Sequence, residues 1–286
     1  IWAVPPLLLI PLCLAFRQRS LVAAILALGL AVGPVMGLCI GWRRALPGAP
    51  AGLEMRVLTC NMHYVKADPR RLNDLLDDVR PDVIALQEWR DSASADELAK
   101  GGWHLHRVPG LFLASRYPLG LVERLGLDST GPQGSAARYE LDTPAGVITV
   151  YNLHLESPRD ALSHVASRGW RGRHELRANS ERRREQSEFL SRHAAQRSGP
   201  VLVLGDFNTT PESVLFRRTW AGYEDAFEES GLGWGHTFVS RPSLVRIDHV
   251  LVGGGGRTRR CWVGPDVGSP HRPVIADIVW PTLELQ

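Results

Sequence analysis

The chain has 286 residues, of which 44% are hydrophobic and 22% are charged, and its formal net charge at pH 7 is +3. One large domain with an appendage fits this length, because a single hydrophobic core serves up to roughly 250 residues. Two of the four cysteines, Cys13 and Cys39, lie in apolar segments. The spacing of Cys60 and Cys261 matches no metal motif, which argues against a cysteine-based metal centre, and their pairing cannot be inferred.

An uncharged N-terminal region is the first feature along the chain. Residues 21–40 carry no charge, and a run of ~20 apolar residues matches the thickness of a bilayer's hydrocarbon core. We therefore expect a membrane-spanning helix over about residues 21–42. Residues 1–16 are also uncharged, but they hold three prolines and begin with Ile rather than Met. We expect them to be a truncated first span of an anchor that covers residues 1–44.

Two alternatives compete with this anchor: a buried core helix and the apolar part of a signal peptide. The anchor is favoured because the run is longer than a usual signal core. In addition, Arg43 and Arg44 follow it where a small-residue cleavage site would be expected. Arginines flank the second span on both sides, so they do not decide its orientation. If the loop at residues 17–20 is cytoplasmic, the main domain is extracytoplasmic.

A linker at residues 45–52 leads into short apolar runs with helical stretches between them. Apolar residues alternate in the runs and recur at helical spacing at positions 72, 75, 76 and 79. Strands are predicted at residues 55–63, 82–89, 111–119, 136–156 (a hairpin turning at 143–146), 200–208, 246–254, 259–264 and 273–280, and helices at 70–81 and 180–195. This pattern favours one domain over residues 53–286, in which two sheets pack face to face with helices outside.

Basic residues concentrate at residues 168–197, and almost all of them are arginine. Arginine suits bidentate contacts with phosphate, and a basic segment that follows His154 would lie near any cleft at that strand end. The competing interpretation is a solvated helix face on which glutamates pair with the arginines. The sequence leaves both interpretations open.

Polar side chains follow several predicted strands at the point where each strand ends. Asp206 and Asn208 follow the apolar run 201–204, and side chains two apart on a strand share one face, so Phe207 points to the other. Gly205 is expected to leave room for a metal or phosphate. Taken singly, such residues are more often turns or caps. Together they would converge on one rim as a polar cleft, which also includes Asn61, Glu88, His154, Asp248 and His271.

The chemistry of this set is oxygen-rich and lacks thiolates. Four side chains suit a hard cation such as Mg²⁺ or Mn²⁺, bound through one or two carboxylates, water and substrate phosphate: Glu88, Asp206, Asn61 and Asn208. His154 and His271 would supply cationic or hydrogen-bonding partners for phosphate oxygens. Asp248 can fix the orientation and charge of a histidine.

Six short motifs occur in order along the domain: TCNMH, ALQEW, YNLHLES, VLGDFNTTP, RIDHVLV and SPHRPVIADI. Their series resembles the endonuclease/exonuclease/phosphatase superfamily, which includes DNase I, apurinic endonucleases, sphingomyelinases and inositol-phosphate phosphatases. The resemblance covers residues 55–280. It implies an α/β fold, a four-layer α/β/β/α sandwich of the DNase I type, here preceded by the N-terminal transmembrane segment.

The resemblance also implies roles for the strand-end residues. Glu88 would be the principal ligand of Mg²⁺ or Mn²⁺, with Asn61 beside it. Asp206 would orient or deprotonate the attacking water. Asn208 would hold the scissile phosphate, and His154 would contact the same phosphate.

Asp248 and His271 would form a carboxylate–imidazole pair. The sequence departs from the family's pattern at two positions. The family commonly has Ser-Asp-His before the last strand, whereas Pro270 stands here between Ser269 and His271. The missing carboxylate favours one metal over two. His63 stands where some nucleases of the family carry an acid, and it is either a phosphate contact or a surface residue.

The N-terminal spans and the motifs GDFNTTPES, GHTF and RIDHVLV are most similar to a bacterial membrane-anchored branch, which includes proteins linked to glycopeptide-antibiotic resistance. This implies a hydrolase in the cell membrane that acts on a phosphodiester, phosphomonoester or pyrophosphate, including a lipid-linked one, by in-line attack of water. Two alternatives are a nuclease acting on DNA or RNA and a non-catalytic phosphate-binding protein on the same fold.

Overall fold

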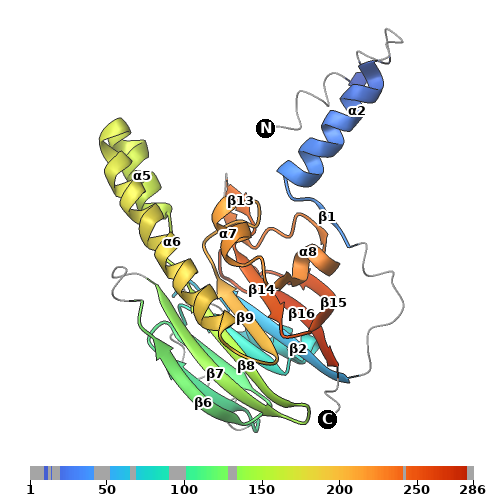
Figure 1. The fold of residues 1–286 in the computed structure, drawn as a ribbon, viewed down its shortest axis with the longest axis vertical. Coiled ribbons are helices and arrows are strands. Elements are labelled where there is room, and N and C mark those ends of the chain that lie inside the picture. Colours follow the sequence, from blue (N-terminus) through green and yellow to red (C-terminus); the bar gives the residue numbers. More distant parts are fainter. Residues whose placement is uncertain are drawn as a thin grey trace.

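The computed structural model describes residues 10–11, 14, 20–41, 52–64, 69–89, 101–127, 134–240 and 243–281. Within these residues, two six-stranded sheets pack face to face (Figure 1). The first sheet has the order β15 (Arg257–Val263), β16 (Val274–Pro281), β2 (Gly52–Asn61), β3 (Val83–Gln87), β5 (Leu111–Ser115) and β4 (His104–Val108). The second has the order β10 (Glu224–Asp225), β14 (Asp248–Gly253), β9 (Val201–Asp206), β8 (Gly146–His154), β7 (Ser135–Thr143) and β6 (Leu119–Leu125). The β2–β3 and β8–β9 pairs are parallel and the others antiparallel.

Helices cover the outer faces of both sheets. The first sheet is covered by α3 (Pro69–Val79), and the second by α6 (Arg173–Ala195) and α7 (Val214–Thr219). A 3-10 turn, Gly169–Gly172, joins α5 (Arg159–Arg168) to α6, and these helices extend beyond the sheets (Figure 1). The shorter elements are α8 (Ala226–Ser230) and the strand pairs β1 (Cys39–Ile40) with β11 (Leu232–Gly233) and β12 (Phe238–Ser240) with β13 (Ser243–Val245). The predicted four-layer α/β/β/α arrangement is thus confirmed.

Strand alternation separates the core between the sheets from the layers under the helices. On β9, Leu202 and Leu204 face the opposite sheet, whereas Val201 and Val203 pack under the helices. On β8, Val150 likewise faces inward. Full burial of one such side chain contributes about 1.5–3 kcal/mol, so the register that buries both faces is strongly favoured.

The same alternation places polar residues at one end of the sandwich. Asn61 ends β2, His154 ends β8 and Asp206 ends β9, while Asp248 begins β14. Asp206 pairs in register with His154 on one side and with Asp248 on the other. Each of these four residues continues the inward-facing series of its strand, so their side chains lie together at one end of the sandwich.

The N-terminal helix is shorter than the sequence predicts. The α-helix α2 (Ser20–Leu30) continues as a π-helix, Ala31–Val35, and Gly37 with φ +71° ends it. The prediction of one helix over residues 21–42 is therefore wrong at its C-terminal end, because Cys39 and Ile40 pair with β11. Within the described part of the chain, no helix has both the length and the apolar character needed to cross a membrane. Most of the predicted first span, 1–16, and most of the linker, 45–52, lie outside the described residues.

Other predicted elements differ from the structure in extent. The single strand predicted at residues 111–119 is two strands, β5 and β6, because Pro118 has no N–H for a ladder and interrupts the run. The helix predicted at 180–195 begins at Arg173. β4 was not predicted: it is a partly exposed edge strand with two histidines, so its apolar alternation is weak.

Gly205 lies where β9 passes close to β8. Its φ is +138°, and a Cβ added there would lie 1.9 Å from the carbonyl oxygen of Leu153. The space beside Gly205 therefore faces the neighbouring backbone. The prediction that it leaves room for a metal or phosphate is wrong, since the inward-facing residue next to it, Asp206, lines the cleft instead.

We expect Gly205→Ala to destabilise the fold by about 3 kcal/mol, because backbone strain adds to a clash that neither strand can relieve. Gly146→Ala is the matched control. Gly146 also has a positive φ, +99°, but a Cβ there meets nothing within 4 Å, so strain alone costs about 1 kcal/mol. Urea unfolding of both variants measures the difference, and equal losses would contradict this account.

Candidate active site

A cleft of about 1640 Å³ opens at the ends of β2, β3, β8 and β9. Six of the seven predicted site residues line it: Asn61, Glu88, His154, Asp206, Asn208 and His271. The seventh, Asp248, is fully buried behind His271 and contacts its ring. The structure therefore brings together residues that are separated by up to about 200 positions in the chain.

The side-chain amide of Asn61 lies between two carboxylates. Its Nδ2 donates to Glu88 Oε1 at 3.1 Å and to Asp206 Oδ2 at 2.9 Å. The imidazole of His154 approaches the same two oxygens, with Nε2 3.4 Å from Glu88 Oε1 and 3.7 Å from Asp206 Oδ2. Two acids from different sheets thus share the donors that lie between them.

Glu88 reaches this position through an unusual backbone conformation. It directly follows β3 and has a φ of +51°. Its N–H donates to Gly110 O at 2.8 Å and its carbonyl accepts from Tyr64 N at 3.0 Å, so the turn is held from both sides. A left-handed non-glycine residue costs on the order of 1–3 kcal/mol, and such strain concentrates at functional sites. The turn directs the carboxylate of Glu88 into the cleft.

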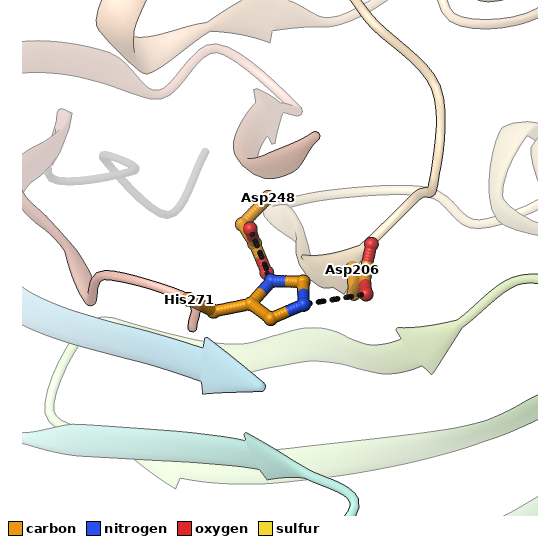
Figure 2. Close-up of side chains that lie close together, drawn as sticks. All are labelled: Asp206, Asp248 and His271. Atoms are coloured by element: carbon orange, nitrogen blue, oxygen red, sulfur yellow. Dashed lines mark hydrogen bonds and ion pairs between the residues drawn. The ribbon is translucent and has the colours of Figure 1, made fainter. Parts of the chain in front are cut away.

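Asp248, His271 and Asp206 form a chain of contacts (Figure 2). His271 Nδ1 lies 2.9 Å from Asp248 Oδ2, and His271 Nε2 lies 3.9 Å from Asp206 Oδ2. Burial lowers the pKa of His271, but the carboxylates of Asp248, Asp206 and Glu88 together outweigh it and raise that pKa to about 9. At neutral pH the ring is therefore a cation, which hydrogen-bonds to Asp248 through Nδ1 and lies within ion-pair distance of Asp206 through Nε2.

Asp206 is buried on the opposite side of this cation. Burial raises the pKa of its carboxyl, and the nearby Asp248 adds to this, whereas His271, His154 and Asn61 lower it. A carboxylate with a raised pKa is a better proton acceptor than an exposed one. The arrangement therefore suits proton transfer at Asp206.

Asn208 is held in a left-handed turn directly after Asp206. Its φ is +49°, its N–H donates to Asp206 Oδ1 at 2.8 Å, and its Nδ2 donates to Leu155 O at 2.7 Å. Arg183 donates to the carbonyl oxygen of Asn208 and, at 2.7 Å, to Thr209 Oγ1. As predicted, Phe207 points the other way, into the layer under the helices.

Arg183 is the main cleft residue that the sequence did not single out. It lies in the basic segment, where α6 pairs arginine with glutamate on one face and brings an arginine to the cleft on another. Arg184 pairs along the helix with Glu181 and, at 2.9 Å, with Glu188. Arg183, about a quarter of a turn away on the helix, faces the cleft instead, and burial lowers its pKa. Helical phase relative to the buried Leu190 is the signal that could have distinguished them.

The donor chemistry of the cleft fits a divalent cation. The carboxylates of Glu88 and Asp206 face one space, and hard oxygen donors of this kind, completed by water and phosphate, suit Mg²⁺ or Mn²⁺. Asp206, Asp248 and His271 also offer ligand atoms within 4.8 Å of one another. However, Asp248 and the Nδ1 of His271 already hydrogen-bond to each other, so Glu88 is the better-suited ligand. Asn61 would join it through Oδ1, which here accepts from His63 N, because its Nδ2 is a donor.

Ser269, the residue before Pro270, connects two parts of the cluster. Its Oγ donates to Asn61 O at 2.6 Å and accepts from His271 N at 3.1 Å. The carbonyl of Pro270 accepts from Val239 N at 2.9 Å. This segment is therefore held in place without the acid that the family commonly has there.

The fold and the site together identify the family. The model of the endonuclease/exonuclease/phosphatase family matches residues 58–271. The chain belongs to the endonuclease/exonuclease/phosphatase family. The matched range includes every residue of the cluster, from Asn61 to His271.

Individual members of the family are only distantly similar in sequence. Exodeoxyribonuclease III of Haemophilus influenzae is 23% identical over 169 residues, which are 56% of this chain and 60% of that protein. The chain therefore spans less than two thirds of this curated relative. Two solved structures share the fold. D. rerio TDP2 complexed with single-strand DNA product is 16% identical with a TM-score of 0.62, and the match covers 79% of this chain and 98% of that chain. The Neisseria 3′ phosphatase NExo bound to product DNA hairpin is 21% identical with a TM-score of 0.57, and the match covers 79% of this chain and 100% of that chain.

We expect the His271 ring of the metal-free protein to titrate near pH 9. Its folded pKa is raised above an unfolded value of about 6.5, so it contributes up to about 3 kcal/mol of stability below pH 6.5. That contribution is lost as the pH rises through about 9. NMR titration of the imidazole and urea unfolding between pH 6 and 10 test this. Asp248→Asn should bring the pKa down, and an unchanged pKa in that variant would contradict the assigned cause.

Proposed function

We propose that the protein is a divalent-metal-dependent phosphoesterase, which hydrolyses a phosphodiester, phosphomonoester or pyrophosphate by in-line attack of water. One observation carries this proposal. Two carboxylates, Glu88 and Asp206, and two imidazoles, His154 and His271, meet around the amide of Asn61 in one cleft. Such a set can place a water, neutralise phosphoryl oxygens and assist a leaving oxygen.

Glu88 and Asn61 would hold Mg²⁺ or Mn²⁺, which when bound neutralises charge on the phosphoryl oxygens. Asp206 orients the attacking water and accepts its proton, in keeping with its raised pKa. Asn208, whose side chain is held by Leu155 O at the wall of the cleft, would contact the scissile phosphate.

The two histidines act on the phosphate from different sides. His154 donates from Nε2, the nitrogen that lies nearest to Glu88 and Asp206. His271 is held as a cation by Asp248 and presents Nε2 toward Asp206, where it stabilises negative charge as it develops on the phosphate. Asp248 acts through His271 and does not itself line the cleft.

A nuclease is the second candidate. Two of the similar proteins are described by their names or titles as an exodeoxyribonuclease and a 3′ phosphatase bound to DNA, and a cleft of about 1640 Å³ would admit more than a single phosphate. Hydrolysis of oligonucleotides in preference to other esters would favour it. Tight phosphate binding without turnover would instead favour a non-catalytic phosphate-binding protein.

We also propose that residues 1–44 anchor the protein in a bacterial membrane, with 45–52 as linker and 53–286 as an extracytoplasmic catalytic domain related to the membrane-anchored branch. Exposed apolar side chains on α2 support an apolar contact: Val22, Ile25, Leu26 and Leu30 are each more than half exposed. A lipid-linked phosphate would then reach a tethered cleft at high effective concentration.

We expect Glu88→Gln and Asp206→Asn each to lower kcat by about 10³-fold or more, because each removes a charge that acts on the reacting atoms. The measurement is a panel of undecaprenyl pyrophosphate, sphingomyelin, phosphoinositides and DNA, assayed with Mg²⁺ or Mn²⁺ and with EDTA. Glu181→Gln, on the exposed face of α6, is the control and should retain full activity. Full activity of the two site variants, or no hydrolysis in any arm, would refute the proposal.

For the anchor, we expect the full chain to fractionate with membranes and to be released by detergent. A variant with Val22, Ile25 and Leu26 changed to Ser should move toward the soluble fraction. A reporter fused after Gln286 should be active only outside the cytoplasm. Reporter activity confined to the cytoplasm would overturn the proposed orientation, and an unchanged distribution of the variant would overturn the role of α2.

A further inference from the structure

A second group of side chains lies at the mouth of the cleft, outside the cluster described above. Arg159, the first residue of α5, places Nη1 3.3 Å from Nε2 of His63. Its guanidinium also lies 5.5 Å from the ring centre of Phe238 on β12. All three residues line the cleft. One arginine thus contacts both sides of the opening.

This group is continuous with the reactive cluster. The N–H of His63 donates to Asn61 Oδ1 at 2.8 Å. On the other side, the ring of Phe238 packs edge to face against His271, with centroids 5.0 Å apart. A single residue therefore separates Arg159 from Asn61 in one direction and from His271 in the other. Any group bound at Arg159 would adjoin a phosphate bound in the cluster.

The charge of this group is not balanced by a neighbouring acid. In the part of the chain that the structure describes, no carboxylate lies within ion-pair distance of Arg159 or of His63, although Asp160 also lines the cleft nearby. Among the described residues, the guanidinium of Arg159 has only the ring of His63 as a hydrogen-bond partner, so an anion at this place would supply acceptors for its other N–H groups.

His63 lies in a strained stretch of backbone. Its φ is +52° and that of Tyr64 is +47°, two consecutive left-handed residues that are not glycine. Strain of on the order of 1–3 kcal/mol at each such residue persists only where the surroundings hold it, and it concentrates at ligand-binding sites. Here the bond to Asn61 holds His63 toward the cleft. The conformation is therefore a second observation, independent of charge, that sets His63 apart from an ordinary surface residue.

We propose that Arg159 and His63 form an anion subsite for a second phosphoryl group, so that the preferred substrate is a diphosphate ester. This inference rests on the proposed phosphoesterase function. The contact of His63 with Asn61 and that of Phe238 with His271 favour a phosphoryl group bonded directly to the one attacked, because only one residue separates Arg159 from the cluster. A more distant nucleic-acid phosphate would not require this closeness.

The reaction at such a substrate is a hydrolysis that needs only water. A new P–O bond forms between the water oxygen and the attacked phosphorus, and the bridging P–O bond breaks. One proton of the water passes to Asp206. The bridging oxygen leaves with its electron pair on the phosphate held by Arg159 and His63, where the guanidinium of Arg159 stabilises the charge that the oxygen gains. The products are one inorganic phosphate and one monophosphate ester.

The test compares Arg159→Gln with Arg168→Gln in the full chain. Arg168 lies at the other end of α5 and does not line the cleft, so its loss makes the same change in net charge on the same helix. With Mg²⁺, kcat/KM is measured for hexyl diphosphate, hexyl monophosphate and decathymidylate. We expect Arg159→Gln to lower kcat/KM for the diphosphate by about 10- to 100-fold, as for loss of a charge-assisted hydrogen bond. The loss of kcat/KM for the monophosphate should be several-fold smaller. Arg168→Gln should match the wild type.

Equal losses on diphosphate and monophosphate, or no loss, would overturn the subsite. A loss confined to decathymidylate would overturn the proposed preference for a diphosphate ester in favour of a nucleic acid.

A second measurement needs no turnover: the binding of inorganic pyrophosphate to the metal-free protein in EDTA, followed by calorimetry. There Arg159→Gln should weaken binding by about tenfold and Arg168→Gln should not. If the wild type hydrolyses no ester but shows this difference, the proposed activity fails and the subsite stands. Equal binding by the wild type, Arg159→Gln and Arg168→Gln would refute the subsite, whether or not the protein hydrolyses an ester.

Discussion

Two carboxylates that face one space repel each other, and the amide of Asn61 is the interaction that allows Glu88 and Asp206 to lie there together. Asn61 ends β2 in one sheet and Asp206 ends β9 in the other, so the amide also connects the two sheets at the cleft. The remaining polar atoms of Asn61 are bonded too: Oδ1 accepts from His63 N and the backbone carbonyl accepts from Ser269 Oγ. Because every one of these bonds fixes its orientation, the residue positions both acids and both loops around them.

A buried polar layer beneath the cleft supports this arrangement. Gln87 Nε2 donates to Thr59 Oγ1 at 3.0 Å and across to Asn152 Oδ1 at 2.8 Å. Asn152 in turn donates to Phe112 O at 2.9 Å. These bonds cross the interface between sheets at a level where the rest of the core is apolar. Sliding one sheet against the other would leave buried amides unpaired, at about 1–3 kcal/mol each, so the sheets are held in the register that the cluster requires.

Much of the site could be predicted because it follows from strand alternation. Asn61, His154 and Asp206 continue the inward-facing series of buried strands, and a period of two is visible in the sequence. What escaped prediction depends on other geometry. The reach of Glu88 comes from a left-handed turn, and the exposure of Arg183 to the cleft depends on the phase of a long helix. The role of Gly205 was misjudged because its nearest neighbour, the backbone of Leu153, is about 50 positions away.

The N-terminal region shows the same limit in a different form. An uncharged run indicates its solvent preference but not where its helix ends. Gly37 ends the helix through a positive φ, and a side chain there would meet Glu212, in the segment that follows Asn208. The strand pairing of Cys39 with Gly233 depends on a partner nearly 200 residues away. Tertiary contacts of this kind override the local pattern.

That pairing has a mechanical consequence. Two residues after Gly37, the chain enters β1, whose bonds to β11 and contact of Cys39 with the inter-sheet core fasten it to the domain. A long flexible tether would leave the domain free to turn about α2, whereas only the short segment between α2 and β1 separates them here. That segment therefore governs how the opening of the cleft is turned toward any surface that α2 contacts. Substrate selection would then depend on the direction from which a substrate approaches the cleft as well as on the residues that line it. Lengthening the segment between α2 and β1 would change that direction and leave the lining residues unchanged.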